Sequence, residues 1–123
     1  QQHALLRRQR QMCIRDRLRS EVPCDKILEN EYALAFSDIN PQAPIHTLVI
    51  PKNPYINFHD FRKNASTKEH ESFWTLVNAV IEHYKVEVEG FRIITNSGNN
   101  GNQDVPHFHI HLLAGENLGR MMN

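Results

Sequence analysis

The chain has 123 residues, with 14 basic and 14 acidic side chains and therefore no formal net charge at pH 7. That length suits one domain with one core, and the balanced charge argues against a general nucleic-acid surface or an anionic-membrane binder. No apolar run is long enough to span a bilayer. The two cysteines, Cys13 and Cys24, are too few for a disulfide framework, so a reducing, cytoplasmic setting is the default.

Residues 1–17 differ in character from the rest of the chain. They start without a methionine and run into an arginine-rich stretch. One interpretation is a basic helical arm that binds nucleic acid or is merely solvated. We favour another, because residues 12–17 resemble the translation of the transposase-end adapter used to fragment DNA for sequencing. We therefore interpret residues 1–17 as a non-native leader and expect a single domain over residues 18–123.

The expected domain opens with a hairpin. Residues 26–29 and 32–36 are the two strands, and Asn30 and Glu31 form the turn between them. The turn signal is moderate, because the second turn position lacks glycine. Cys24, just before the hairpin, is expected to be a small buried or edge residue.

A loop and a central strand follow. The loop over residues 38–44 contains two prolines, which interrupt regular structure. Residues 47–50 are continuously apolar after Thr47, as is typical of a strand with both faces covered. His46 stands at the start of this strand, where a lone histidine is more often structural than functional.

The clearest expected element is an amphipathic helix. Ser66 is a good N-cap and Glu69 lies three residues further on, which is the capping-box pattern. Within residues 73–84, apolar side chains recur at helical spacing and form one stripe that should pack on a sheet. Trp74 lies beside this stripe and is either an ordinary core-edge residue or a dimer contact. One short helical turn is expected within residues 55–61.

Two further strands are expected near the end of the chain. Residues 91–95 form one, and residues 96–103, rich in Asn and Gly, connect it to the next. This connection is either a flexible hairpin loop or an anion-binding loop, whose glycines let backbone N–H groups approach a phosphate. The order strand-strand-strand-helix-strand-strand predicts an α+β fold, an antiparallel sheet with one main helix packed on it.

The last strand carries the main chemical feature. In residues 107–113, histidines alternate with apolar residues. Alternate side chains of a strand point to opposite faces, so His107, His109 and His111 are expected on one face, each roughly 7 Å from the next. Phe108 and its alternates should face a core. A metal site and a nucleophilic histidine site both fit this spacing, whereas an inactive cluster of buried imidazoles is hard to justify.

The residues around these histidines resemble the histidine-triad superfamily. Residues 107–113 match its signature of alternating histidine and apolar positions. Residues 36–46 and the Leu-Val-Ile-Pro-Lys run after them resemble the nucleoside-binding segment of its branch of histidine-triad nucleotide-binding proteins. Residues 96–107 match the phosphate-side loop of that branch. The resemblance spans residues 18 to about 119 and implies the same α+β fold, usually as a homodimer whose sheets join across the two-fold axis.

The resemblance also implies a role for each matching residue. His109 would be the nucleophile on the α-phosphorus of an AMP-type purine nucleotide, and His107 and His111 would orient it and contact the phosphate. His46 would be the fourth member of the cluster, and Asp38 would accept hydrogen bonds from the ribose hydroxyls. The expected nucleotide contacts, comprising the ribose carboxylate, the apolar base slot and the phosphate loop, are Phe36, Asp38, Ile39, Asn96, Gln103, Asp104 and Val105.

The implied activity is hydrolysis of purine nucleoside phosphoramidates or related adenylylated compounds through a covalent nucleotidyl-histidine. The implied mechanism needs no metal or other cofactor. Three alternatives stay open: hydrolysis of dinucleoside polyphosphates, a nucleotide-binding regulatory module with little turnover, and a histidine metal site.

The chain departs from this family pattern at Asp104, where nucleotide-binding members often carry Ser. A carboxylate near the phosphate-binding loop could repel the substrate or raise the pKa of a histidine, so the preferred leaving group stays open. Many bacterial relatives also have a Cys-x-x-Cys near the start that can bind zinc. That region is lost or replaced here.

Overall fold

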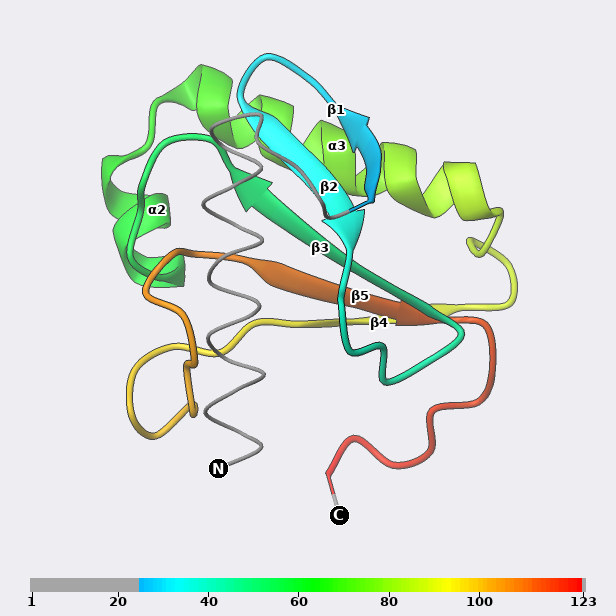
Figure 1. Ribbon diagram of the computed structural model, residues 1–123. Helices are drawn as coiled ribbons and strands as arrows, with labels where there is room; N and C mark the ends of the chain where they lie inside the picture. Colours follow the sequence, from blue (N-terminus) through cyan, green and yellow to red (C-terminus); the bar gives the residue numbers. More distant parts are fainter. Residues whose placement is uncertain (1–24, 123) are drawn as a thin grey trace.

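The computed structural model describes residues 25–122, so the interpretation of residues 1–17 and the prediction for Cys24 lie outside the described part of the chain. Within these described residues, five antiparallel strands form one sheet in the order β1-β2-β3-β5-β4, and two helices accompany it (Figure 1). The α+β architecture expected from the sequence is therefore confirmed. The elements are β1 (Lys26–Glu29), β2 (Ala33–Ser37), β3 (Ile45–Pro51), α2 (Phe58–Asn64), α3 (Thr67–Tyr84), β4 (Phe91–Ile94) and β5 (Ile110–Ala114).

The first three strands follow the expected hairpin and central strand. The side-chain oxygen of Asn30 accepts hydrogen bonds from the backbone N–H groups of Tyr32 and Ala33, which closes the turn between β1 and β2. β3 is longer than the apolar run predicted, because it pairs with β2 on one side and β5 on the other. His46 is the second residue of this strand and pairs with Leu113, in agreement with its expected place at the strand start.

The helices also differ in one respect from the expectation. α3 begins with the predicted capping box between Ser66 and Glu69. It ends at Tyr84, and the next residue, Lys85, caps it in the left-handed backbone conformation (φ 57°) that often terminates helices. The short turn expected within residues 55–61 is instead the seven-residue helix α2, which starts later and is capped by Asn57.

The main core lies between the sheet and α3, which covers one face of β1, β2 and β3 (Figure 1). The apolar stripe of α3 is buried there, with Phe73 fully inaccessible. Phe108 and its alternates Ile110 and Leu112 are at most 1% exposed and belong to the same core, as the alternating pattern predicted. A second buried cluster consists of Leu34, Phe36, Leu48, Ile50 and Val105.

The expectation that one strand carries all three histidines is wrong. β5 begins only at Ile110, so His111 is the one histidine of the three that lies on it. The N–H of His107 donates a hydrogen bond to the carbonyl oxygen of Val105. The N–H of Phe108 donates to the carbonyl oxygen of Tyr55, so neither bond belongs to the pairing between strands. Pro106 has no N–H to offer a neighbouring strand. The backbone therefore bends before β5, and strand pairing positions only His111 of the three histidines.

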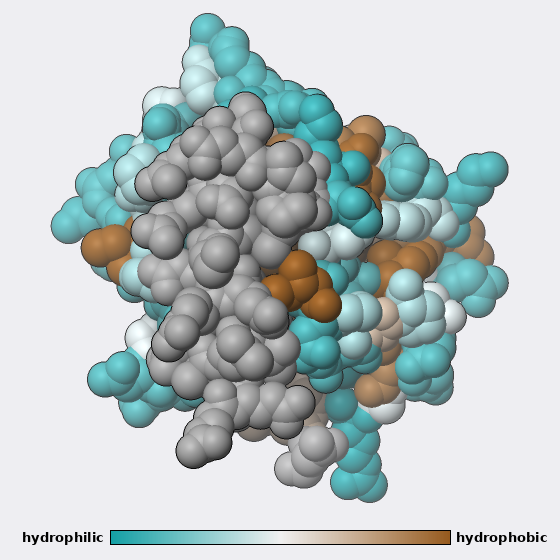
Figure 2. All heavy atoms as spheres, viewed as in Figure 1, coloured by the Kyte–Doolittle hydropathy of each residue, from teal (hydrophilic) through white to brown (hydrophobic). Residues whose placement is uncertain are grey.

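No helix within residues 25–122 is long and apolar enough to cross a membrane. In the space-filling view, hydrophobic residues of the described surface occupy small separate areas among hydrophilic ones (Figure 2). Trp74, on α3, is 41% exposed and packs edge-on against Phe73. Its proposed role as a dimer contact stays a prediction.

Candidate functional site

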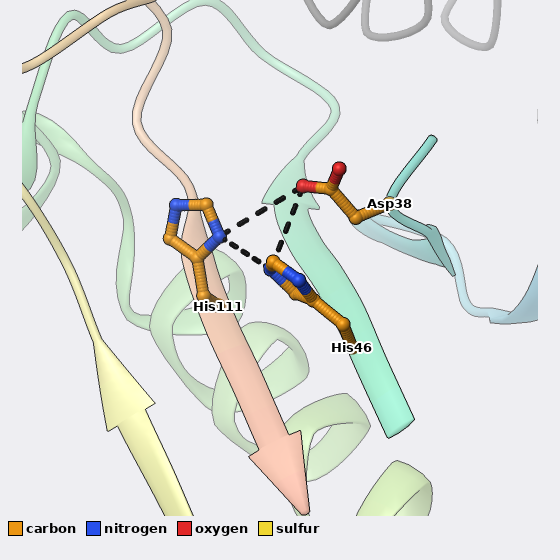
Figure 3. A group of neighbouring side chains, drawn as sticks. All are labelled: Asp38, His46 and His111. Atoms are coloured by element: carbon orange, nitrogen blue, oxygen red, sulfur yellow. Dashed lines mark hydrogen bonds and ion pairs between the residues drawn. The ribbon is translucent and has the colours of Figure 1, made fainter. Parts of the chain in front are cut away.

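Three strands bring a carboxylate and two imidazoles together. Asp38 directly follows β2, His46 lies on β3, and His111 lies on β5 (Figure 3). An oxygen of Asp38 is 3.5 Å from Nε2 of His46 and 4.0 Å from Nδ1 of His111, and the two imidazole nitrogens are 2.9 Å apart. The Asp38 side chain is inaccessible and that of His46 is 3% exposed. Residues far apart in the sequence thus form one compact polar cluster.

The hydrogen bonds fix the tautomers of the neutral imidazoles in this cluster. The backbone N–H of Gln42 donates to Nδ1 of His46, so the His46 proton is on Nε2. That proton points towards Nδ1 of His111, which accepts it, and leaves the proton of His111 on Nε2. His111 can therefore donate a hydrogen bond from the side of its ring that faces away from His46.

Asp38, His46 and His111 also offer three ligand atoms within 4.8 Å of one another, which is a possible metal-binding arrangement. Tetrahedral Zn–N bonds of 2.0–2.1 Å require ligand nitrogens about 3.3 Å apart. The 2.9 Å contact between His46 and His111 is shorter and has the length of a hydrogen bond. The geometry therefore fits a hydrogen-bonded cluster better than a metal centre, although a small ring movement would be enough to admit an ion.

His109 extends this cluster. Its ring centroid is 5.1 Å from that of His111, which is in turn 5.1 Å from that of His46. Nδ1 of His109 lies 2.8 Å from the carbonyl oxygen of His107. A carbonyl only accepts, so the neutral imidazole carries its proton on Nδ1 and an electron pair on Nε2. The Thr95 hydroxyl donates to the carbonyl of His109 and holds its backbone in place.

His107 orients His109 through its backbone carbonyl, while its own ring is bonded elsewhere. Nε2 of His107 donates to the carbonyl oxygen of Pro51 at the end of β3. Burial lowers the pKa of His107, the hydrogen bond to Pro51 opposes this, and the neighbouring His109 lowers it further. The net shift is downward, so His107 favours the neutral form. Its ring fixes the backbone whose carbonyl orients His109.

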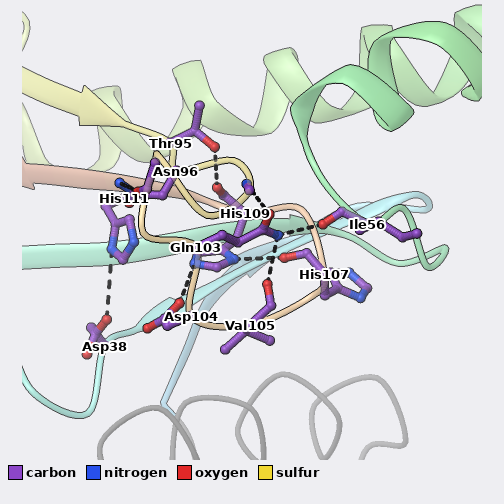
Figure 4. A network of polar contacts seen from close by, with 12 residues as sticks. Asp38, Ile56, Thr95, Asn96, Gln103, Asp104, Val105, His107, His109 and His111 are labelled. Atoms are coloured by element: carbon purple, nitrogen blue, oxygen red, sulfur yellow. Dashed lines mark hydrogen bonds and ion pairs between the residues drawn. The ribbon is translucent and has the colours of Figure 1, made fainter. Parts of the chain in front are cut away.

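The loop before the histidines is braced by its own amides (Figure 4). The amide nitrogen of Gln103 donates to the carbonyls of Ile56 and Val105, and its oxygen accepts from the N–H of Gly98. Asn96 donates to the carbonyl of Gly101 within the same loop. Both amides therefore shape the loop, and their expected contact with a phosphate stays a prediction.

Gly98 has φ +64°, a conformation that strains most side chains. A Cβ at Gly101 would collide with the backbone of Ser97. The backbone conformation at Gly98 and the close approach of Ser97 to Gly101 explain why glycine suits both positions.

Asp104 projects from this loop towards His109 (Figure 4). One carboxylate oxygen lies 3.8 Å from Nε2 of His109, the nitrogen with the electron pair. The Asp104 side chain is 28% exposed, whereas that of His109 is 4% exposed. The residue at which the sequence departs from the pattern that it otherwise resembles therefore lies next to His109, for which that resemblance implies the role of nucleophile.

The expected base-binding residues differ in accessibility. Phe36 is fully buried and Val105 is 2% exposed, both in the second cluster. Ile39 is 41% exposed beside Asp38. The structure thus leaves Ile39 available to a ligand, and the apolar slot for a base stays a prediction.

Sequence reasoning missed the groups that orient the histidines. These are backbone atoms of Gln42, Pro51 and His107, together with the Thr95 hydroxyl. Backbone donors and acceptors leave no signal in residue types. Thr95 was assigned only as the last residue of a strand, and nothing in the sequence around it distinguishes its hydroxyl.

An antiparallel sheet with one long helix, and a histidine cluster at the start of β5, define a histidine-triad class of protein. The HIT domain family model matches residues 19–118. The chain belongs to this family.

Curated relatives and solved structures agree with that assignment. An uncharacterized 13.2 kDa HIT-like protein of Azospirillum brasilense is 49% identical over 105 residues, 85% of this chain and 86% of that protein. The purine nucleoside phosphoramidase of Escherichia coli is 36% identical over 109 residues, 85% and 87% of the two chains. A HIT family hydrolase from Legionella pneumophila superimposes with a TM-score of 0.76 at 29% identity, over 85% of this chain and 92% of that one.

Proposed function

We propose that this protein binds purine nucleotides and hydrolyses purine nucleoside phosphoramidates or other adenylylated compounds. The observation that carries the proposal is the orientation of His109, whose Nδ1 proton is held by the carbonyl of His107. This leaves Nε2 with an electron pair beside an imidazole that can donate. The similarity to the Escherichia coli purine nucleoside phosphoramidase supports the substrate class.

In the proposed first step, Nε2 of His109 attacks the α-phosphorus and the bond from phosphorus to the leaving nitrogen breaks. The electron pair of that bond leaves with the amine, which takes up a proton from solvent. In a second step a water molecule attacks phosphorus and gives up a proton to solvent, while the bond to Nε2 breaks and AMP is released. During both steps the carbonyl of His107 would stabilise the positive charge on the His109 ring through the Nδ1 proton.

The other cluster members have roles that follow from their hydrogen bonds. The Nε2 proton of His111 would donate to a phosphate oxygen, because His46 already occupies Nδ1. Developing charge on phosphoryl oxygens is stabilised most by donors that are oriented in advance. Asp38 would accept hydrogen bonds from the ribose hydroxyls once ligand binding exposes its side chain, which is inaccessible in this structure. The Asn40 N–H holds one of its oxygens in position. Ile39 would contact the base, whereas the fully buried Phe36 would not reach it. The loop braced by Gln103 would surround the phosphate.

The test is the replacement of His109 by Asn, which cannot form a stable phosphoryl intermediate. Turnover of an adenosine phosphoramidate should fall by at least about 10³-fold, while AMP still binds. His59→Asn, at an exposed histidine of α2, serves as the matched control and should keep full activity. Substantial turnover by the His109 variant would exclude this residue as the nucleophile. AMP binding without any turnover by the unaltered protein would favour a regulatory module.

We also propose that two copies associate through β4, the edge strand at one end of the described sheet order. Phe91, Ile93 and Ile94 on this strand are 38–41% exposed. Apolar side chains beside a strand edge favour pairing with another strand. Light scattering during size-exclusion chromatography measures the association, and a mass of one chain at micromolar concentration would contradict it.

A further inference from the structure

Asp104 places a negative charge next to the atom proposed to attack phosphorus. Its oxygen is 3.8 Å from Nε2 of His109, and reacting atoms in a bound substrate approach to about 3–3.5 Å. The carboxylate would therefore lie within about 7 Å of the phosphorus in any productive complex. A phosphoryl group is itself anionic, so this carboxylate must weaken its binding by an amount that depends on phosphoryl charge.

Substrate and product differ in that charge. A nucleoside phosphoramidate has a single ionisable oxygen on phosphorus and carries one negative charge. The product, a nucleoside monophosphate, has a second ionisation near pH 6 and is mostly a dianion above pH 7. The same carboxylate therefore repels the product about twice as strongly as the substrate.

We infer that Asp104 selects nucleotides by the charge of the phosphoryl group, favouring singly charged phosphoramidates and phosphodiesters and weakening the binding of the doubly charged monophosphate. This inference rests on the proposed function, because it takes His109 as the residue that faces phosphorus. Asp104 then acts as a specificity residue: it limits inhibition by product and disfavours free monophosphates in the cell as competitors. Its partial exposure suits this role, because a ligand can approach the side chain from solvent.

The experiment compares two adenosine ligands at pH 8 by calorimetry. AMP is the dianion, and its 5′-phosphate methyl ester is the monoanion of nearly equal size. In Asp104→Asn, which keeps the shape and removes the charge, AMP should bind about tenfold more tightly. The methyl ester should gain only about threefold, the square root of that factor, because it carries half the charge.

Two control variants isolate the charge of this side chain. Asp104→Glu keeps the carboxylate and should retain the preference for the methyl ester over AMP. Glu87→Gln removes one negative charge at an exposed position after α3 and should change neither affinity. Thermal unfolding of each variant establishes that it is folded.

The results separate this inference from the proposed function. Equal gains for both ligands in Asp104→Asn, or no gain for AMP, would overturn the charge selection while leaving His109 as the nucleophile. A change only in the rate for different leaving groups would also overturn it, because Asp104 would then act on the departing amine. Failure of the unaltered protein to bind either ligand would overturn both.

Discussion

Two regions of the molecule, the core under α3 and the polar site, are built on different principles. The face under α3 is apolar, and Phe73, Phe108 and Leu112 are buried in it by packing alone. At the site, buried polar groups such as Asp38, His46 and His109 are each held by a directed hydrogen bond or ion pair. Hydrophobic packing is non-directional, whereas a buried polar group must find its partner. Stability should therefore depend mainly on the first region, and reactivity on the second.

The largest expected effect on stability is in the core under α3. Phe73→Ala should reduce the free energy of unfolding by about 3–5 kcal/mol, because it leaves a cavity among aromatic neighbours. Urea denaturation measures the loss. Phe58→Ala, at a residue that is 43% exposed, is the matched control and should cost clearly less. Similar losses in the two variants would mean that the buried face does not dominate stability.

The next effect is expected in the polar site. His46→Ala removes the donor to His111 and the acceptor for the Gln42 N–H. Turnover of an adenosine phosphoramidate should fall about 10–100-fold, equivalent to about 1.4–2.8 kcal/mol in the barrier, with a smaller change in KM. His83→Ala, at an exposed histidine of α3, is the control for losing an imidazole. A loss of stability as large as that of Phe73→Ala would assign His46 to the fold instead of the chemistry.

A smaller effect should appear in the pH dependence of stability. Burial, the largest cause, lowers the pKa of His107 below its ordinary 6.5 in the folded state. The unfolded chain therefore binds a proton more readily, and stability falls as pH drops below about 6.5. His107→Gln should make the unfolding free energy vary less between pH 7.5 and 5.

The exposed His59 provides the control for this pH dependence, because His59→Gln should leave it unchanged. Glu29 titrates below the pH range of this experiment, because hydrogen bonds from Lys26 and Lys52 lower its pKa to about 2. An unchanged pH slope in His107→Gln would mean that this imidazole is not desolvated in solution.

The smallest effect is expected on removing metal ions. The 2.9 Å hydrogen bond between His46 and His111 favours a metal-free cluster, so a strong chelator should leave both turnover and melting temperature unchanged. Elemental analysis of the purified protein provides an independent measurement. Loss of activity that zinc restores would instead make Asp38, His46 and His111 a metal centre.

Much of the fold was predictable because it follows from local patterns. The capping box at Ser66, the apolar stripe of α3 and the apolar alternates of Phe108 depend on nearby residues and on periodicity. The resemblance of residues 36–46 and 107–113 also predicted that Asp38 and His109 lie near one another, and the structure places both next to His111. The bend before β5 was not predictable, because it follows from bonds to Val105 and Tyr55 that only the folded chain brings within reach.

The sequence by itself determined the element order, the buried faces and the set of histidines, since residue types and spacing specify which groups are apolar and which can titrate. Only the tertiary structure decided how those histidines are oriented. The carbonyl of His107 selects the tautomer of His109, the N–H of Gln42 selects that of His46, and the loop places Asp104 beside His109. These relations depend on backbone atoms, which every residue shares, and on distances that arise only when separate strands pack together.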